Sequence, residues 1–258
     1  MSTFAKKRTI LHLVYQGCCN FSCGKLKTMT NENLSFNEFN TLTDWKNVSC
    51  LYPFTPNGES FRGGAFWCIP NQGPTYDVFG VQNGEYRTIR SERGTSVKTL
   101  NGIWGEATAD ISWEAKENTL TSRAFIASLK NNTLVRPGFH PYFKVSGNFT
   151  ITIGKKTFTN ETIALNNRLT VIVHNEGKAT LEQEYSKTEI SFTARSNGPE
   201  MTISFCLWTD NKEKYICIEP VVGKDITKEE LFDGSPAPLM LKKGDTVTID
   251  STITTTSW

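Results

Sequence analysis

A histidine framed by aromatic residues is the side chain best placed to do chemistry in this sequence. His140 stands in the segment Arg-Pro-Gly-Phe-His-Pro-Tyr-Phe, in which residues 137–138 predict a turn. Pro141 disfavours the helical region for the residue before it, so we expect this segment to be extended. Residues i and i+2 of an extended chain share a face, which puts His140 and Tyr142 on the same side. A histidine held in this way can act as a general acid or base, although an isolated one is more often structural.

A glutamate further along the chain supplies a second candidate group for proton transfer. Residues 215–219 predict a buried strand that ends at Glu219, and alternation puts Tyr215, Cys217 and Glu219 on one face. A carboxylate among apolar residues is costly unless it is paired or at a cavity mouth, and loss of water raises its pKa towards the range of a general base. A lone glutamate at a strand end more often just reaches solvent. Together with His140, and with a proline after each, it suits proton transfer at two ends of a small polar substrate.

Two arginines and an asparagine lie in glycine-containing segments. Arg62 precedes a glycine pair, and Asn83 begins the segment Asn-Gly-Glu-Tyr-Arg, which ends at Arg87. These segments predict loops over a β scaffold, where binding residues usually lie, and a guanidinium group can hold hydroxyls, carboxylates or phosphates. The glycine pair is not a phosphate loop, because it precedes a strand and lacks the Gly-Lys-Ser/Thr end. Taken alone, each segment is better explained as a pair of tight turns.

The seven cysteines form no pattern that is typical of a structural metal site. Cys18, Cys19 and Cys23 lie close together without Cys-x-x-Cys spacing. A zinc site made from Cys19, Cys23 and His12 would lack a second pair of ligands at the usual spacing, so we expect no metal. The apolar run at residues 9–15 is short and interrupted by His12, which predicts a first strand rather than a signal peptide. An odd number of cysteines then favours free thiols in a reducing compartment, and we expect a cytoplasmic protein.

Composition narrows the classes of partner. The chain has 258 residues, a formal charge of +2, 38% hydrophobic and 11% aromatic residues, so it is long enough to bury a substantial core. Charges of both signs are interspersed, which argues against nucleic acid as a partner. No apolar run approaches the ~20 residues that span a bilayer. We therefore expect a small-molecule ligand, no membrane partner and, by default, a monomer.

Short strands dominate the expected secondary structure. Runs rich in β-branched and aromatic residues, separated by turn clusters, predict an all-β antiparallel sandwich or barrel. Helix is scarce, since capping boxes predict only one short helix at residues 227–232 and a weaker one near Ser35. No linker or repeat interrupts the chain, so we expect a single domain over residues 1–258. The expected strands are 9–15, 65–69, 96–100, 109–113, 120–129, 149–153, 169–173, 189–194, 201–208, 215–219 and 245–255.

Two of these motifs resemble those of a known family. Gly-Phe-His-Pro-Tyr-Phe at 138–143, followed by Ile-Glu-Pro at 218–220, resembles the galactose mutarotase (aldose 1-epimerase) family, and most closely the branch with the glucose-6-phosphate 1-epimerases. The segments around Arg62 and Asn83 are similar to that family's first binding loops, so the resemblance covers the chain from about Phe61 onward. It implies an all-β fold, the antiparallel galactose mutarotase-like β-supersandwich with very little helix, and a sugar bound on its concave side.

The resemblance also implies roles for individual residues. Glu219 would take the proton from the anomeric hydroxyl and His140 would protonate the ring oxygen. An aldose 1-epimerase of this kind interconverts the α and β anomers of a hexose or hexose phosphate, and neither a cofactor nor a metal is implied. The residues implied in substrate binding are Arg62, Asn83, Arg87 and Tyr142.

One departure from the family pattern keeps alternatives open. Asn83 stands where family members usually carry a histidine, and an amide can donate a hydrogen bond but cannot carry a proton. A non-catalytic carbohydrate-binding protein on the same fold therefore stays a hypothesis. A third hypothesis is an unrelated β-sandwich interaction domain, which predicts that His140 and Glu219 lie far apart. Because Arg62 can hold a phosphate or hydroxyls, both a free sugar and a sugar phosphate fit.

Overall fold

The computed structural model describes the chain from residue 50 onward, with gaps. The described residues are 50–52, 55–57, 60–62, 64–69, 85–91, 94–100, 105–163, 171–174, 176–224 and 237–258. Within them every paired strand is antiparallel and no helix is present, as expected for an all-β chain. None of these residues forms a helix with the length and hydrophobicity needed to cross a membrane. The expected strand at 9–15, the expected helices at 227–232 and near Ser35, and the first three cysteines lie outside the described residues.

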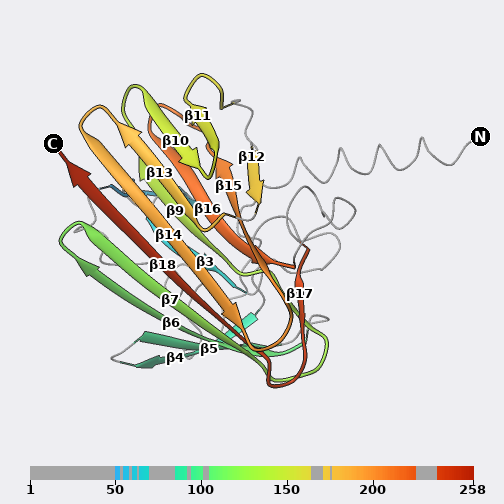
Figure 1. Cartoon of the computed structure of the whole chain (residues 1–258). Helices are drawn as coiled ribbons and strands as arrows, with labels where there is room; N and C mark the ends of the chain where they lie inside the picture. The colour runs from blue at the N-terminus through green and yellow to red at the C-terminus, as the bar shows by residue number, and fades with distance from the viewer. Residues whose placement is uncertain are drawn as a thin grey trace, which may run out of the picture.

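The larger sheet has nine strands, and alternation of side chains gives it one buried face. Its long strands lie side by side in Figure 1. Strand β18 shows the pattern most clearly, since every second residue from Val247 to Thr255 is buried. Such alternation is typical of an antiparallel sheet with only one face in the core. The strands lie in the order β11 (Lys156–Thr159), β10 (Phe149–Ile153), β13 (Lys178–Gln183), β14 (Ser186–Ser196), β18 (Thr246–Ser257), β7 (Thr119–Ser128), β6 (Ala107–Lys116), β5 (Gly94–Leu100) and β4 (Glu85–Ser91).

The smaller sheet has five strands, and its inner strands are buried on both faces. All nine residues of β16 are buried, as are five of the seven in β9. Two further pairs of short strands, β1 (Thr55–Asn57) with β2 (Ser60–Arg62) and β17 (Leu239–Leu241) with β8 (Thr133–Val135), complete the described structure. The five strands lie in the order β12 (Val171–His174), β15 (Thr202–Trp208), β16 (Tyr215–Gly223), β9 (Gly138–Lys144) and β3 (Ala65–Cys68).

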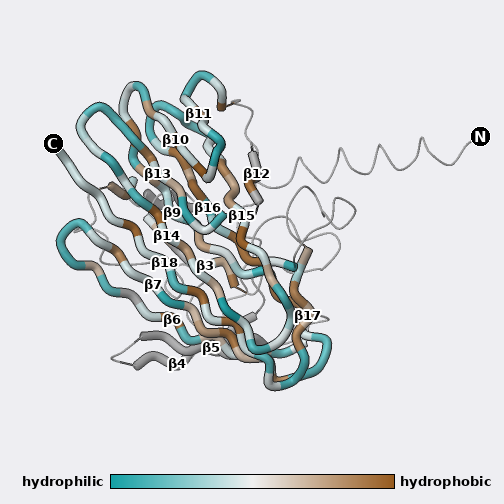
Figure 2. The backbone as a smooth tube through the Cα atoms, in the orientation of Figure 1, coloured by the Kyte–Doolittle hydropathy of each residue, from teal (hydrophilic) through white to brown (hydrophobic). Residues whose placement is uncertain are grey.

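The hydrophobic core lies between these two sheets. Trp67 of β3 is fully buried and contacts Phe139 of its own sheet and Phe192 of the larger sheet, with ring centroids 5.0 and 6.2 Å apart. Its indole Nε1 donates a hydrogen bond of 2.7 Å to the Ser122 hydroxyl of β7. Figure 2 shows hydrophilic residues gathered at the hairpin turns and hydrophobic ones along the inner strands. The two sheets therefore form a sandwich.

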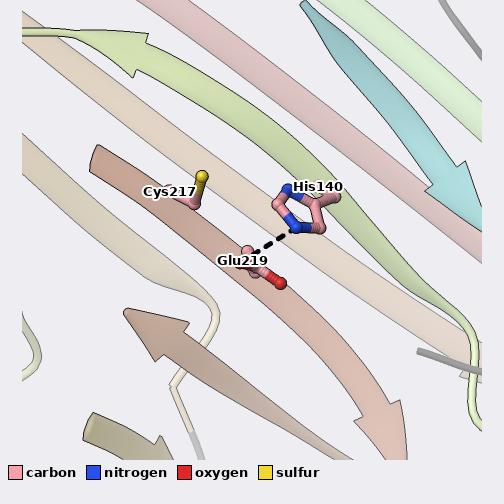
Figure 3. Close-up of side chains that lie close together, drawn as sticks. All are labelled: His140, Cys217 and Glu219. Carbon is pink, nitrogen blue, oxygen red and sulfur yellow. Dashed lines mark ion pairs between the residues drawn. The ribbon is translucent and has the colours of Figure 1, made fainter. Parts of the chain in front are cut away.

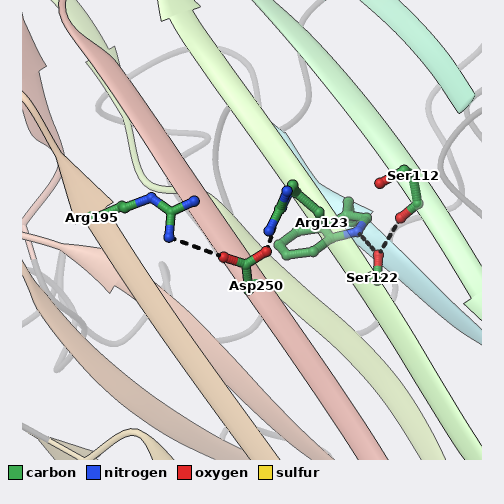
Figure 4. A network of polar contacts seen from close by, with 6 residues as sticks. Ser112, Ser122, Arg123, Arg195 and Asp250 are labelled. Carbon is green, nitrogen blue, oxygen red and sulfur yellow. Dashed lines mark hydrogen bonds and ion pairs between the residues drawn. The ribbon is translucent and has the colours of Figure 1, made fainter.

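Strand β7 assigns neighbouring side chains to opposite faces of the larger sheet. Ser122 points inward, where it also donates to the Ser112 carbonyl. The next residue, Arg123, points outward, and its Nε lies 2.5 Å from Oδ1 of Asp250 on β18 (Figure 4). Arg195 of β14 approaches the other oxygen of that carboxylate at 3.6 Å. Since both arginines are exposed, each of these ion pairs contributes at most about 1 kcal/mol.

Candidate active site

The register of β9 and β16 sets His140 opposite Glu219. Tyr142 pairs with Cys217 on one side of this position and Gly138 with Val221 on the other. Counting inward from either pair brings His140 and Glu219 together. Two backbone hydrogen bonds lie beyond these pairs: the Val145 N–H donates to the Lys214 carbonyl, and the Val222 N–H donates to the Pro137 carbonyl. In an antiparallel ladder, hydrogen-bonded pairs of residues such as these alternate with pairs that are not hydrogen-bonded. His140 and Glu219 thus occupy a non-hydrogen-bonded position, where side chains of facing residues lie closest.

The prolines that follow these two residues interrupt the ladder at this point. By the same alternation, the amides of residues 141 and 220 would each donate to the facing strand, and proline has no such donor. From the sequence, the strand is predicted to end at Glu219 and residues 137–138 are predicted to form a turn. Both predictions are wrong, since β16 continues to Gly223 and β9 begins at Gly138. Proline is normally kept out of central strands because it breaks the ladder. Here two prolines, one on each strand, remove backbone donors from the same short stretch of the ladder between β9 and β16.

The two side chains form a close acid–base pair. His140 Nε2 lies 3.3 Å from Glu219 Oε1, and the side chains are 16% and 8% exposed (Figure 3). A buried carboxylate is destabilising without a partner, and the imidazole supplies one. The hypothesis of an unrelated interaction domain predicted that these residues lie far apart, and they do not.

Aromatic rings frame this pair. The Tyr142 ring stacks on the His140 imidazole, with centroids 4.8 Å apart and an interplanar angle of 14°. Trp208 of β15 meets the same imidazole edge-on at 6.1 Å and 75°. Tyr215 packs on Tyr142 at 5.2 Å and is itself covered by Tyr52 at 5.0 Å. The rings restrict the imidazole to one orientation towards Glu219.

Three thiols lie on the same face of the smaller sheet. Cys217 precedes Glu219 by two residues on β16, Cys206 faces Glu219 from β15, and Cys68 faces Gly138 from β3. All three are buried, and the four cysteines of the described residues are free, as expected. Burial raises the pKa of the Cys68 thiol well above its ordinary value, and the negative charge of Glu219 adds to the shift. Cys68 is therefore a neutral thiol at physiological pH.

Comparison with known proteins places this architecture. No family model and no curated protein sequence matches the chain. Solved structures do. The Slr1438 protein of Synechocystis sp. PCC 6803 matches with a TM-score of 0.52 at 16% identity, over 81% of this chain and 85% of its own. An Escherichia coli K12 protein provisionally named an aldose 1-epimerase matches with a TM-score of 0.52 at 12% identity, over 80% of this chain and 89% of its own. A galactose mutarotase related enzyme from Lactobacillus acidophilus matches with a TM-score of 0.49 at 12% identity, over 79% of this chain and 87% of its own. The chain has the galactose mutarotase-like fold.

The residues predicted for the site are distributed unevenly over this mutarotase-like fold. His140, Glu219 and Tyr142 lie together on the smaller sheet. Arg62 and Arg87 were expected on loops, but their backbones belong to β2 and to β4, the edge strand of the larger sheet. Glycine and amide neighbours favoured turns in both cases, and pairing with an adjacent strand overrides that local preference. Asn83 lies outside the described residues.

Sequence reasoning missed three residues beside the pair, namely Trp208, Cys206 and Cys68. The first two fall in the expected strand 201–208, and their even numbers put them on the same face. Alternation therefore predicts that these two side chains lie on the same face, but it does not predict which face of the strand lies beside Glu219. Cys68 carried no signal of its own, because its position depends on the pairing of β3 with β9.

Proposed function

We propose that this protein is an aldose 1-epimerase that interconverts the α and β anomers of a hexose or hexose phosphate. The observation that carries the proposal is the 3.3 Å approach of His140 Nε2 to Glu219 Oε1 on one partly accessible face. Anomerisation moves one proton off the O1 hydroxyl and one onto the ring oxygen O5. These two oxygens are bonded to the same carbon, C1. An acid and a base as close together as this pair can therefore serve both at once.

Glu219 acts as the general base and His140 as the general acid. The carboxylate takes the proton of the O1 hydroxyl, the O1 electron pair forms the C1–O1 double bond, and the C1–O5 bond breaks. O5 takes the proton of the imidazolium group. Rotation about C1–C2 then presents the other face of the aldehyde, and O5 attacks C1 with the proton transfers reversed. Every bond broken is formed again, so the reaction needs no oxidant, reductant or group carrier, and each proton-transfer group contributes roughly 10²–10⁴-fold.

The surroundings of the pair support this assignment of roles. Stacking of Tyr142 and the edge contact of Trp208 fix the imidazole plane, which keeps Nε2 directed at the place where O5 would lie. Low exposure removes competing water and strengthens the electrostatic effect of each charge. Tyr142 also offers a hydroxyl to the sugar. Arg62, Arg87 and Asn83 are the further residues that the family resemblance assigns to hydroxyls or a phosphate.

A second function is a carbohydrate-binding protein without catalysis. The observation in its favour is Asn83, which stands where the family usually carries a histidine that helps polarise the ring oxygen. An amide cannot supply a positive charge there. Under this hypothesis the protein binds a sugar while leaving its anomeric exchange at the solution rate.

The test is the rate of exchange between anomers of glucose, galactose and glucose 6-phosphate, measured by saturation-transfer NMR. Wild type should accelerate the exchange of at least one sugar, and Glu219→Gln should lower that acceleration by roughly 10²–10⁴-fold with sugar affinity changed only a few-fold. Glu189→Gln is the matched control, because that side chain is 63% exposed and lies on β14 of the other sheet. Equal rates for wild type and Glu219→Gln would contradict the epimerase. Sugar binding without acceleration would support the binding protein.

A further inference from the structure

The acid–base pair belongs to a larger cluster of metal-binding side chains. The donor atoms of His140, Cys217 and Glu219 all lie within 4.8 Å of one another (Figure 3). Cys217 shares its face of β16 with Glu219 and lies diagonally across the ladder from His140. Its side chain is fully buried and comes from an inner strand, so its position is fixed by the sheet itself.

The chemistry of this donor set matches zinc. One imidazole, one thiolate and one carboxylate are all common Zn²⁺ ligands, whereas a thiolate is a poor ligand for Mg²⁺ or Ca²⁺. Around tetrahedral Zn²⁺ with bonds of about 2.0–2.1 Å, nitrogen and oxygen ligands lie roughly 3.3–3.4 Å apart. His140 Nε2 and Glu219 Oε1 are already 3.3 Å apart. We propose that His140, Cys217 and Glu219 bind one Zn²⁺ ion.

Three protein ligands leave the fourth position of a tetrahedral ion open for water or a sugar oxygen. Binding displaces the thiol proton of Cys217, and the ion engages the lone pairs of both His140 Nε2 and Glu219. If these two residues are the acid and the base proposed above, neither can then exchange a proton with the sugar. In this respect the inference rests on the proposed function: Zn²⁺ is a reversible inhibitor of the epimerase.

Metal binding can be tested without any measurement of activity. Co²⁺ replaces Zn²⁺ in such sites, and its bond to a thiolate gives a charge-transfer band in the near ultraviolet. The full-length protein, stripped with a chelator, is titrated with Co²⁺ and then with Zn²⁺ in competition. Wild type should show the band at one equivalent, and Zn²⁺ should abolish it. Cys217→Ser should lose the band, and His140→Gln should weaken Co²⁺ binding by at least tenfold.

Two control variants make the result specific. Cys206→Ser removes another buried thiol on the same face, outside the cluster of three donors, and should keep the band. Cys19→Ser removes a thiol of the N-terminal group and should keep it too. No band in wild type would overturn the proposal, as would a band that survives Cys217→Ser or that Cys19→Ser abolishes. If Cys217→Ser does not fold, the tenfold effect of His140→Gln decides, and equal Co²⁺ affinity in that variant overturns the proposal.

A separate arm links the metal to the reaction. Zn²⁺ at one equivalent should abolish the anomer exchange of wild type, and EDTA should restore it. If the metal-free protein accelerates no exchange while the thiolate band is present, the proposed function fails and the zinc site stands. If exchange is catalysed and the band is absent, the zinc site fails and the epimerase stands.

Discussion

At the scale of single residues, Glu219 is a carboxylate in a buried position, where desolvation of its charge is unfavourable. Its side chain is 8% exposed, and moving an ion from water into such a site carries a penalty of several kcal/mol. A nearby imidazole offsets part of that penalty, but a well-packed pair of apolar residues would stabilise a sheet as well or better. Stability alone therefore does not account for His140 and Glu219 at this position, whereas the proton transfer proposed above would.

The Cys50 thiol gives a pH dependence at the same scale. Burial raises its pKa above the ordinary value of 9.0, and hydrogen bonds with Thr255 and Thr188 act in the opposite direction. The unfolded chain therefore loses this proton at lower pH than the folded protein does. The contribution to the free energy of unfolding is complete below about pH 9 and is lost as pH rises above it, by at most about 1.4 kcal/mol per pH unit.

Urea unfolding at about pH 8 and about pH 10 measures this effect. Wild type should lose more unfolding free energy between the two than Cys50→Ala, which has no thiol to titrate at this position. Equal losses in the two proteins would show that the Cys50 pKa is the same folded and unfolded.

At the scale of elements, the ladder between β9 and β16 creates the pair. Because Pro141 and Pro220 lack donors, one ladder hydrogen bond is missing on each side of the pair His140 and Glu219. Pro141→Ala restores one donor, which should bond to the Ile218 carbonyl. The gain of about 0.5–1.5 kcal/mol is offset by the greater freedom of the unfolded chain, about 0.4–1 kcal/mol, so the free energy of unfolding should change by less than about 1 kcal/mol.

Amide hydrogen exchange is the measurement that checks this prediction. The new amide at position 141 should be protected, whereas the one created by Pro199→Ala, in the turn after β14, should exchange freely. Rapid exchange at position 141 would mean that β9 and β16 are not aligned as described, and that His140 does not face Glu219 across the ladder.

At the scale of the whole molecule, the larger sheet packs against the face of the smaller sheet that lies opposite the site. The core face of the smaller sheet is anchored to the larger one by Trp67, which donates to Ser122. Ser122→Ala should lower the free energy of unfolding by about 1–3 kcal/mol, since it leaves a buried indole N–H without its acceptor. Ser251, which pairs with Ser122 across β18 and β7, is the matched control, because its buried hydroxyl has no hydrogen-bond partner within the described structure.

Denaturant midpoints of the two variants give the comparison. Ser251→Ala should be neutral or slightly stabilising, since it removes a desolvated hydroxyl that makes no bond. Equal destabilisation by both substitutions would mean that the hydrogen bond between the sheets contributes nothing beyond the loss of a hydroxyl.

Side-chain facing could be predicted from the sequence, but strand pairing could not. Alternation placed His140 with Tyr142, and Cys217 with Glu219, because a strand has a period of two whatever its partners. That β9 pairs with β16 depends on contacts between distant segments, and only the family resemblance suggested it. The strand end at Glu219 was predicted wrongly, because the pairing of β16 with β15 and β9 continues beyond Pro220 although that proline lacks a donor.

The central claim is that His140 and Glu219 act as one unit in ring opening. The most direct measurement is the anomer-exchange rate of a responsive hexose for wild type, His140→Gln, Glu219→Gln and the double variant. Each single variant should lose roughly 10²–10⁴-fold, and the double variant should lie within about tenfold of the slower single one, because removing either partner disables the pair. A His140→Gln variant with the wild-type rate, or losses that multiply in the double variant, would contradict the claim.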